Sequence, residues 1–170
     1  MNDAAELVAM PTPEIVYLAL GSNLGDRRLN LEAAIAALPP AVTVLERSPL
    51  YETAPWGVTD QPDFLNMVLK GETRLAPVAL LARLKRMEKK LGRLPTVRYG
   101  PRLIDIDILF YGSQVLSTPA LTIPHPRLHE RTFVLVPLAD VAAAFIHPVL
   151  GKSVRDLLAG IDVNGVKRYE

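Results

Sequence analysis

Residues 104–108 read Ile-Asp-Ile-Asp-Ile, and this strict alternation constrains the fold more than any other stretch of the chain. A period of two residues is that of a β-strand, so the isoleucines point to one face of a sheet and Asp105 and Asp107 to the other. Two neighbouring carboxylates repel each other unless an opposite charge offsets them. Mg²⁺ prefers oxygen ligands and often shares them with phosphates, so the pair predicts a magnesium-nucleotide site.

An Asp-x-Asp pair on an amphipathic strand is also found at solvated sheet edges, so its surroundings matter. Arg98 and Arg102 bracket a Gly100-Pro101 turn directly before the acidic strand. Guanidinium groups bind phosphate oxygens through paired hydrogen bonds. Arginines beside the two acids therefore favour phosphoryl-type transfer from a magnesium nucleotide.

Composition limits the class of protein. A chain of 170 residues, 49% of them hydrophobic, fits one domain with a substantial core. A net charge of +1 argues against a general nucleic-acid or membrane-surface binder, and the lack of cysteine excludes disulfides and thiolate metal sites. No apolar run reaches the length of a membrane span, and the start lacks the basic region of a signal peptide. We expect a cytoplasmic protein with a flexible tail at 1–13 and one domain at 14–170.

Hydrophobic periodicity divides the chain into strands and helices. Asp26 is expected to cap the first helix and Gly92 to end the second. We expect strands over 15–20, 42–51, 64–73 and 104–110, helices over 26–38, 76–91, 133–144 and 153–159, a helical turn at 124–127, and loops over 53–62 and 92–102. This β-α-β-β-α-β order predicts an α+β, ferredoxin-like split βαβ fold with an antiparallel sheet flanked by helices. Unrelated activities share that order, so it says little about function.

Other side chains suggest binding roles with alternatives beside them. Phe64 and Asn66 share a strand face, which suits a flat heterocycle but equally suits a core aromatic next to a buried amide. His125, between two prolines, is expected to be a fixed donor to a phosphate. His129 lies four residues later, but no HExxH pattern surrounds the pair, so a zinc site is disfavoured. The Gly21–Asp26 segment lacks the lysine of a phosphate-binding P-loop and is interpreted as a tight turn.

Five sequence blocks together resemble one enzyme family. They are LALGSNLGDR at 18–27, YETAPWG at 51–57, DQPDFLN at 60–66, RYGPRLIDIDILFYG at 98–112 and LTIPHPRLHERTFVLVPL at 121–138. The chain resembles the 6-hydroxymethyl-7,8-dihydropterin pyrophosphokinases of folate biosynthesis. The resemblance implies a pyrophosphokinase domain that transfers pyrophosphate from ATP, with two Mg²⁺ ions, to the pterin hydroxymethyl group and releases AMP. It implies small-molecule substrates, no nucleic-acid or membrane partner, and a monomer.

The resemblance also assigns residues. It implies that Asp105 and Asp107 bind the metal ions and act in catalysis with Arg93 and Arg102. The implied ATP-binding residues are Arg98, Tyr99, Arg102, Ile108, Thr122, His125 and Arg131. The implied pterin-binding residues are Thr53, Ala54, Trp56, Phe64, Asn66 and Phe133. Gly21-Ser22-Asn23 is expected at the pocket floor.

Departures from the family pattern fall in the same loops. Tyr99 stands where many members have Trp, Phe64 replaces a frequent Tyr, and Leu94-Pro95-Thr96 occupies a place where some members carry another arginine. The Gly and Pro content of 54–62 and 92–101 predicts loops that close over the substrates. Two alternatives remain at this stage: another Asp-x-Asp metal-dependent transferase, and a non-enzymatic ferredoxin-like ligand-binding module.

Overall fold

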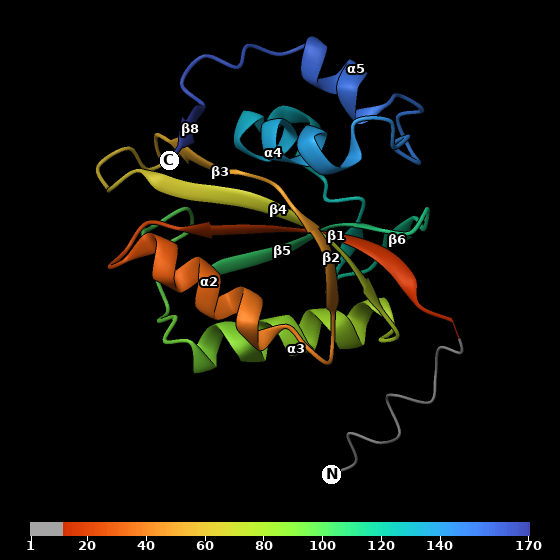
Figure 1. Cartoon of the computed structure of the whole chain (residues 1–170), viewed down its shortest axis with the longest axis horizontal. Helices are drawn as coiled ribbons and strands as arrows, with labels where there is room; N and C mark the ends of the chain where they lie inside the picture. Colours follow the sequence, from red (N-terminus) through yellow and green to blue (C-terminus); the bar gives the residue numbers. More distant parts are fainter. Residues whose placement is uncertain (1–11) are drawn as a thin grey trace.

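An antiparallel sheet separates two helical layers in the computed structural model of the chain, which describes residues 12–170 (Figure 1). The sheet runs in the order β5-β1-β4-β3-β8, and β2 also pairs with β4. Its strands are β1 (Glu14–Ser22), β2 (Thr43–Arg47), β3 (Leu50–Thr53), β4 (Phe64–Thr73), β5 (Asp105–Tyr111) and β8 (Lys167–Tyr169). The order β5-β1-β4-β2/β3, antiparallel throughout, confirms the ferredoxin-like arrangement.

Helices α2 (Arg27–Ala37) and α3 (Pro77–Lys90) cover one face of the sheet (Figure 1). The Asp26 carboxylate accepts a hydrogen bond from the Leu29 amide at 3.0 Å, so it caps α2 as predicted. Gly92 has φ 103°, a left-handed conformation that ends α3 at little steric cost. The isoleucines of β5 pack into the core between this face and the helices.

Helices α4 (Thr132–Ala142) and α5 (Val154–Ala159) cover the other face, preceded by the 3₁₀ helix η1 (Leu128–Glu130) (Figure 1). A second core forms here around Tyr17 and Phe110, whose rings meet edge to face at 6.1 Å. The two acids of β5 point to this side, opposite the isoleucines, as the alternation predicts. Within residues 12–170, no helix combines the length and apolarity needed to cross a bilayer.

One row of residues runs across three strands. Gly21 of β1 pairs with Asp105 of β5 on one side and with Asn66 of β4 on the other. Side chains on one row of a sheet point to the same face. An acid and an amide therefore flank a glycine on the α4 side of the sheet.

The prediction of one strand over 42–51 is wrong, because the chain breaks at Ser48-Pro49 into β2 and β3. Ser48 forms a backbone hydrogen bond to Val68 of β4, and its hydroxyl also accepts a bond from the Val68 amide at 2.9 Å. Proline cannot donate to the ladder, so regular pairing stops there.

Other differences are smaller. The helical turn expected at 124–127 instead lies at Leu128–Glu130, and α4 spans 132–142 rather than 133–144. Strand β8 and the hairpin of β6 (Leu116–Ser117) with β7 (Thr122–Ile123) were not predicted. Apart from residues 12 and 13, the predicted tail lies outside the described residues.

Candidate active site

A cavity of about 460 Å³ opens on the α4 side of the sheet. Its floor is the end of β1 at Ala19 and Gly21, and its walls come from the beginnings of β4, β5 and α4. This volume is typical of a small-molecule site. The row of Asp105, Gly21 and Asn66 lines it.

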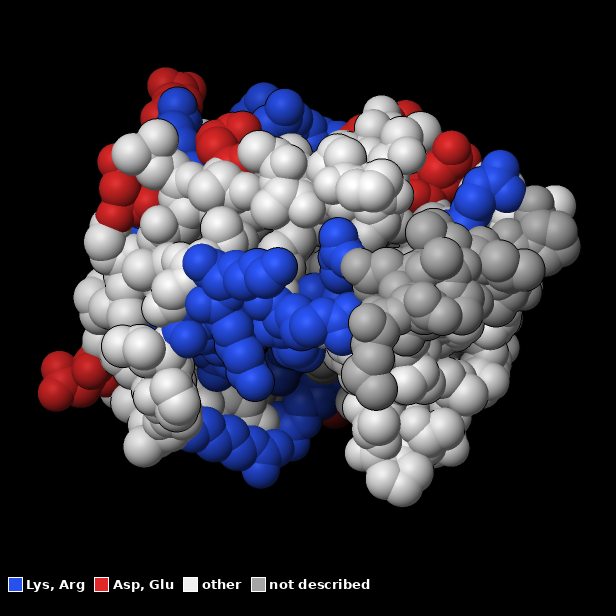
Figure 2. Space-filling model, turned by 90° about the horizontal axis from the view of Figure 1, so that it is seen from below, with Lys and Arg blue, Asp and Glu red and all other residues white. Residues whose placement is uncertain are grey.

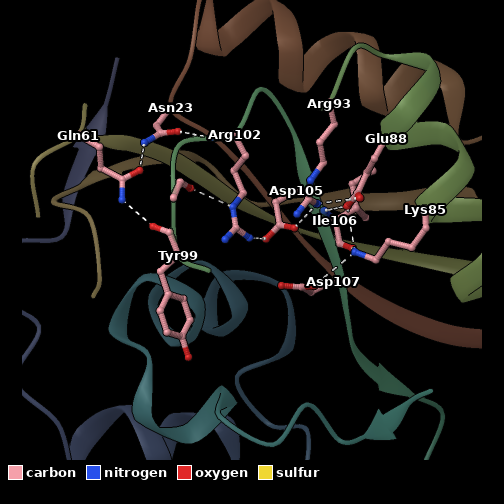
Figure 3. A network of polar contacts seen from close by, with 11 residues as sticks. Asn23, Gln61, Lys85, Glu88, Arg93, Tyr99, Arg102, Asp105, Ile106 and Asp107 are labelled. Atoms are coloured by element: carbon pink, nitrogen blue, oxygen red, sulfur yellow. Dashed lines mark hydrogen bonds and ion pairs between the residues drawn. The ribbon is translucent and has the colours of Figure 1, made fainter. Parts of the chain in front are cut away.

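The two acids of β5 face the cavity with unequal partners (Figure 3). Asp105 accepts hydrogen bonds from Arg93 at 2.7 Å and from Arg102 at 3.0 Å. Within the described part of the chain, the one cation in ion-pair distance of Asp107 is the ammonium group of Lys85, at 3.8 Å. The charge of Asp105 is thus well compensated and that of Asp107 is not.

This asymmetry separates the acidities of the two carboxyls. Burial and the charge of Asp105 raise the pKa of Asp107 to about 6, against the opposing charges of Lys85 and Arg131. The pKa of Asp105 is lowered, because the charges of Arg102, Lys85 and Arg93 outweigh the effect of burial. Repulsion between the two acids is what a bound cation would relieve.

Buried Glu88 of α3 binds the acidic strand β5 from the face of the sheet that α2 and α3 cover. Its carboxylate accepts hydrogen bonds from Arg93 at 2.7 Å, Lys85 at 3.0 Å and the Ile106 amide at 2.7 Å (Figure 3). Each of these groups borders Asp105 or Asp107. Glu88 therefore holds the side chains of Lys85 and Arg93 in position beside Asp105 and Asp107.

Polar and aromatic side chains on β3 and β4 form the other half of the cavity. The Asn66 amide donates to the Thr53 hydroxyl at 2.8 Å, which fixes the amide plane next to Phe64. A Cβ at Gly21 would come within 2.9 Å of the Asn66 Oδ1. Glycine therefore keeps the floor open between a flat aromatic wall and a hydrogen-bonding edge.

Buried Asn23 joins the two loops that flank the cavity. Its Oδ1 accepts a hydrogen bond from the Arg102 amide at 2.8 Å, and its Nδ2 donates to Gln61 at 2.8 Å (Figure 3). Gln61 in turn donates to the Tyr99 carbonyl at 2.6 Å. The loop between β3 and β4 is thereby connected to the basic loop that precedes β5.

Aromatic and guanidinium groups gather at the rim. The rings of Trp56 and Tyr99 meet edge to face at 5.3 Å, and Arg131 lies 5.0 Å from the Trp56 ring. Arg98 and Arg127 both donate to the Tyr99 hydroxyl, at 3.0 and 2.9 Å. Desolvation is outweighed by the Arg98 hydrogen bond and the nearby guanidinium charges, so the pKa of Tyr99 is lowered.

His125 is held in one orientation at the side of the cavity. Its amide donates to the Leu109 carbonyl at 3.0 Å, and its Nδ1 accepts from the Arg127 amide at 3.2 Å. Burial and the charge of Arg131 lower the pKa of His125 to about 4. At neutral pH the ring is uncharged, with Nε2 as its N–H donor.

The cavity brings together most of the residues that the sequence singles out. It is lined by Thr53, Ala54, Trp56, Phe64, Asn66, Arg98, Tyr99, Arg102, Asp105, Asp107, His125, Arg131 and Phe133. Three others do not line it: Arg93 lies behind Asp105, Ile108 is 3% exposed in the opposite core, and Thr122 is exposed on β7. Their roles in catalysis and nucleotide binding stay predictions.

Sequence reasoning missed Lys85, Glu88 and Arg127. Glu88 follows directly after Met87 of the apolar helical stripe, and an acid on that flank is the available signal. Arg127 directly follows His125-Pro126, but nothing in the local pattern indicates its aromatic partners. Lys89 and Lys90 are exposed at the end of α3, where cations favour the helix dipole. Basic groups gather on the face of the molecule that α2 and α3 cover (Figure 2).

The two acids of β5 fit a magnesium ion. Within residues 12–170, no group of three or more His, Asp or Glu side chains is placed to hold a metal. Mg²⁺ is usually bound through one or two carboxylates and completes its coordination with waters and phosphate oxygens. The under-compensated Asp107 beside Asp105 provides such a donor pair.

Structural comparison agrees with the fold. A crystal structure of a Plasmodium falciparum HPPK-DHPS triple mutant superimposes with a TM-score of 0.78, covering 97% of this chain and 48% of that one at 18% identity. At this identity the likeness concerns the fold alone.

Sequence comparison identifies the family. The 2-amino-4-hydroxy-6-hydroxymethyldihydropteridine pyrophosphokinase of Methylorubrum extorquens is 44% identical over 156 residues, 91% of this chain and 98% of the relative. The folic acid synthesis protein of Pneumocystis carinii is 44% identical over 91% of this chain, which spans only 21% of that protein. A bifunctional folate synthesis protein of Pisum sativum is 48% identical over 78% of this chain and 26% of its own length. The model of 7,8-dihydro-6-hydroxymethylpterin-pyrophosphokinase (HPPK) matches residues 17–143, and the chain belongs to this family of enzymes.

Proposed function

We propose that this chain transfers the terminal diphosphate of MgATP to 6-hydroxymethyl-7,8-dihydropterin, releasing AMP. The observation that carries the proposal is the content of one cavity. The acidic pair of β5 and the aromatic and amide groups of β4 line the same 460 Å³ space, joined by Gly21. A nucleotide phosphate and a flat ring placed there would be neighbours.

The ring half of the cavity suits a pterin. Phe64 and Phe133 provide two aromatic walls, and the Asn66 amide, fixed by Thr53, offers a donor and an acceptor to the edge of the heterocycle. Gly21 leaves room for the ring to reach the floor. Binding there would present the hydroxymethyl group toward Asp105.

The phosphate half requires a cation. Magnesium held by Asp105 and Asp107 would supply Lewis-acid polarisation of the β-phosphoryl group and neutralise charge on the leaving AMP. Arg102 and Arg98 line the same side and offer forked donors to phosphate oxygens. Neutral His125, with Nε2 free to donate, adds a fixed hydrogen bond without another positive charge. The hydroxymethyl oxygen would attack the β-phosphorus and release its proton to solvent. The bond between the β-phosphorus and the α,β-bridging oxygen would break, and that oxygen would leave with AMP.

The hydrogen bonds between the two loops support a proposed order of substrate binding. Gln61 and Asn23 tie the loop at 54–63 to the basic loop. We propose that MgATP binds first and that its contacts with the basic loop complete the pterin pocket. Equal pterin affinity with and without a non-hydrolysable MgATP analogue would contradict this order.

A product assay tests the activity itself. The protein is incubated with ATP, Mg²⁺ and 6-hydroxymethyl-7,8-dihydropterin, and the products are separated. AMP with a pterin diphosphate is expected. Release of pyrophosphate or a nucleoside diphosphate would indicate another Asp-x-Asp transferase. If no product forms but isothermal titration calorimetry detects ligand binding, the chain is a ligand-binding module.

Three further features belong to the proposal: two magnesium ions in the active complex, a monomer, and a cytoplasmic location. Asp105 and Asp107 would hold both ions if phosphate oxygens and waters supplied the remaining ligands. Activity against magnesium concentration at fixed MgATP reports a requirement for a second ion. Light scattering reports the oligomeric state, and cell fractionation the location.

A further inference from the structure

Three segments far apart in sequence meet at the rim of the cavity. Trp56 comes from the loop between β3 and β4, Tyr99 from the loop between α3 and β5, and Arg127 from the turn before η1. The Arg127 guanidinium donates to the Tyr99 hydroxyl at 2.9 Å and lies 5.2 Å from the centre of the Trp56 ring. One side chain therefore contacts both loops at once.

Arg127 is attached to the rigid part of the molecule. Its amide donates to the His125 ring at 3.2 Å, and the His125 amide donates to the Leu109 carbonyl of β5 at 3.0 Å. Among residues 12–170, no carboxylate lies within ion-pair distance of this guanidinium, and its side-chain partners are the Tyr99 hydroxyl and the Trp56 ring. The backbone of Arg127 is thus held next to β5, while its guanidinium group reaches the loops that carry Trp56 and Tyr99.

The loops themselves are shaped for this contact. Tyr99 has φ 60°, an uncommon conformation for a residue with a side chain, and Gly57 has φ 87°. A Cβ on Gly57 would approach the Tyr99 ring to 3.0 Å, so the two loops touch without intervening side chains. A local conformation that costs energy persists only where surrounding contacts hold it.

We propose that Arg127 is a positioning residue that clasps Trp56 and Tyr99 together, so that the pterin-side loop and the basic loop close as one lid. The expected effect on the pterin KM rests on the proposed function, whereas the contact of Arg127 with Trp56 and Tyr99 does not. Trp56 lines the ring half of the cavity and Tyr99 the phosphate half. Loss of the clasp therefore weakens pterin capture more than it slows the transfer step.

The only tryptophan of the chain is Trp56, which provides a direct probe. The experiment measures Trp56 emission and its quenching by acrylamide in the free protein, for the wild type, Arg127→Met and Arg127→Lys. Arg155→Met is the matched control, because Arg155 is exposed on α5 and does not line the cavity. Tyr99→Phe, which removes only a hydroxyl, serves if Arg127→Met fails to fold.

Arg127→Met is expected to raise the quenching constant of Trp56, with a smaller change for Arg127→Lys and none for Arg155→Met. The pterin KM is expected to rise about three- to tenfold with less than about a twofold change in kcat, as for loss of a partly exposed cation–π contact and one charged hydrogen bond. Tyr99→Phe in the Arg127→Met background is expected to add little to either value.

Unchanged quenching in both Arg127→Met and Tyr99→Phe overturns the clasp, whatever the enzyme does. Changed quenching with an unchanged pterin KM overturns its role in substrate capture. Changed quenching in a protein without pyrophosphokinase activity leaves the contact established and removes the proposed function instead.

Discussion

Glu88 and Arg93 form an ion pair of 2.7 Å whose carboxylate is 3% exposed, and the same guanidinium nitrogen binds Asp105. Arg93 was predicted to act in catalysis, and in the structure it joins a buried helix acid to a strand acid. The buried Glu88 carboxylate holds the Arg93 side chain in position from the side away from the cavity. Loading the acidic pair with a cation would free part of its charge for phosphate.

Removal of the buried acid is expected to destabilise the fold. Glu88→Ala leaves Arg93, Lys85 and the Ile106 amide without their shared acceptor, at a cost of about 3 kcal/mol in the free energy of unfolding. Urea denaturation measures this value. Glu32→Ala is the control, since its pair with Arg47 is more than half exposed on both sides and contributes at most about 1 kcal/mol. Equal losses in the two variants would contradict the anchoring role.

Substitution of either acid of β5 is expected to separate catalysis from ring binding. Asp105→Ala and Asp107→Ala should each lower kcat at least about a hundredfold, because transition-state charge stabilisation is lost. Pterin affinity, measured by calorimetry, should change far less. Lys89→Ala, at an exposed position on α3, should retain turnover. A comparable loss in Lys89→Ala and Asp105→Ala would argue against the assignment.

The raised pKa of Asp107 predicts a pH-dependent stability. The folded protein binds this proton more tightly than the unfolded chain, so ionised Asp107 destabilises the fold increasingly as pH rises through about 6. Without metal, Asp107→Asn should exceed the wild type in stability by about 1–2 kcal/mol near pH 8, after allowance for solvent screening, and by little near pH 4. Denaturation curves at both pH values measure the difference. Mg²⁺ should reduce it near pH 8, because the cation stabilises the ionised acid; a pH-independent difference would be contrary evidence.

Filling the cavity floor is expected to block the ring. Gly21→Ala places a methyl group 2.9 Å from the Asn66 Oδ1 and 3.7 Å from Phe64. The pterin dissociation constant should rise about tenfold or more, as expected when a binding group is displaced or its hydrogen bonds are lost. Gly160→Ala, where a Cβ meets nothing closer than 3.6 Å, is the control for affinity. Titration with unchanged affinity in Gly21→Ala would place the ring elsewhere.

Local periodicity accounts for the elements that were predicted well. The alternation at 104–108 and the apolar stripe of α3 carry their own burial pattern, so β5 and α3 appear in the sequence without tertiary information. The break at Ser48 does not, because it depends on the Val68 amide of another strand. Strand β8 is equally non-local: it pairs with β3, and Arg27 and Arg28 lie over its Tyr169 ring.

The site divides in the same way. Asp105 and Asp107 were predicted from the chemistry of their own sequence block, and Asn66 from the family resemblance. Residues that act through others, such as Glu88 and Arg127, depend on contacts across elements. From the sequence alone, Glu88 beside the apolar stripe of α3 is interpreted as a solvent-exposed acid. Its burial becomes evident only from its hydrogen bond to the Ile106 amide of β5.

Under the proposed function, the row from Asp105 through Gly21 to Asn66 would set the distance between the two substrates. Two inter-strand spacings fix the Cα atoms of the acid and the amide roughly 9.5–10 Å apart. Closure of the proposed lid above this row would leave that distance unchanged. In the proposed complex, the backbone hydrogen bonds between β5, β1 and β4 would therefore set the distance between the bound metal and the bound heterocycle.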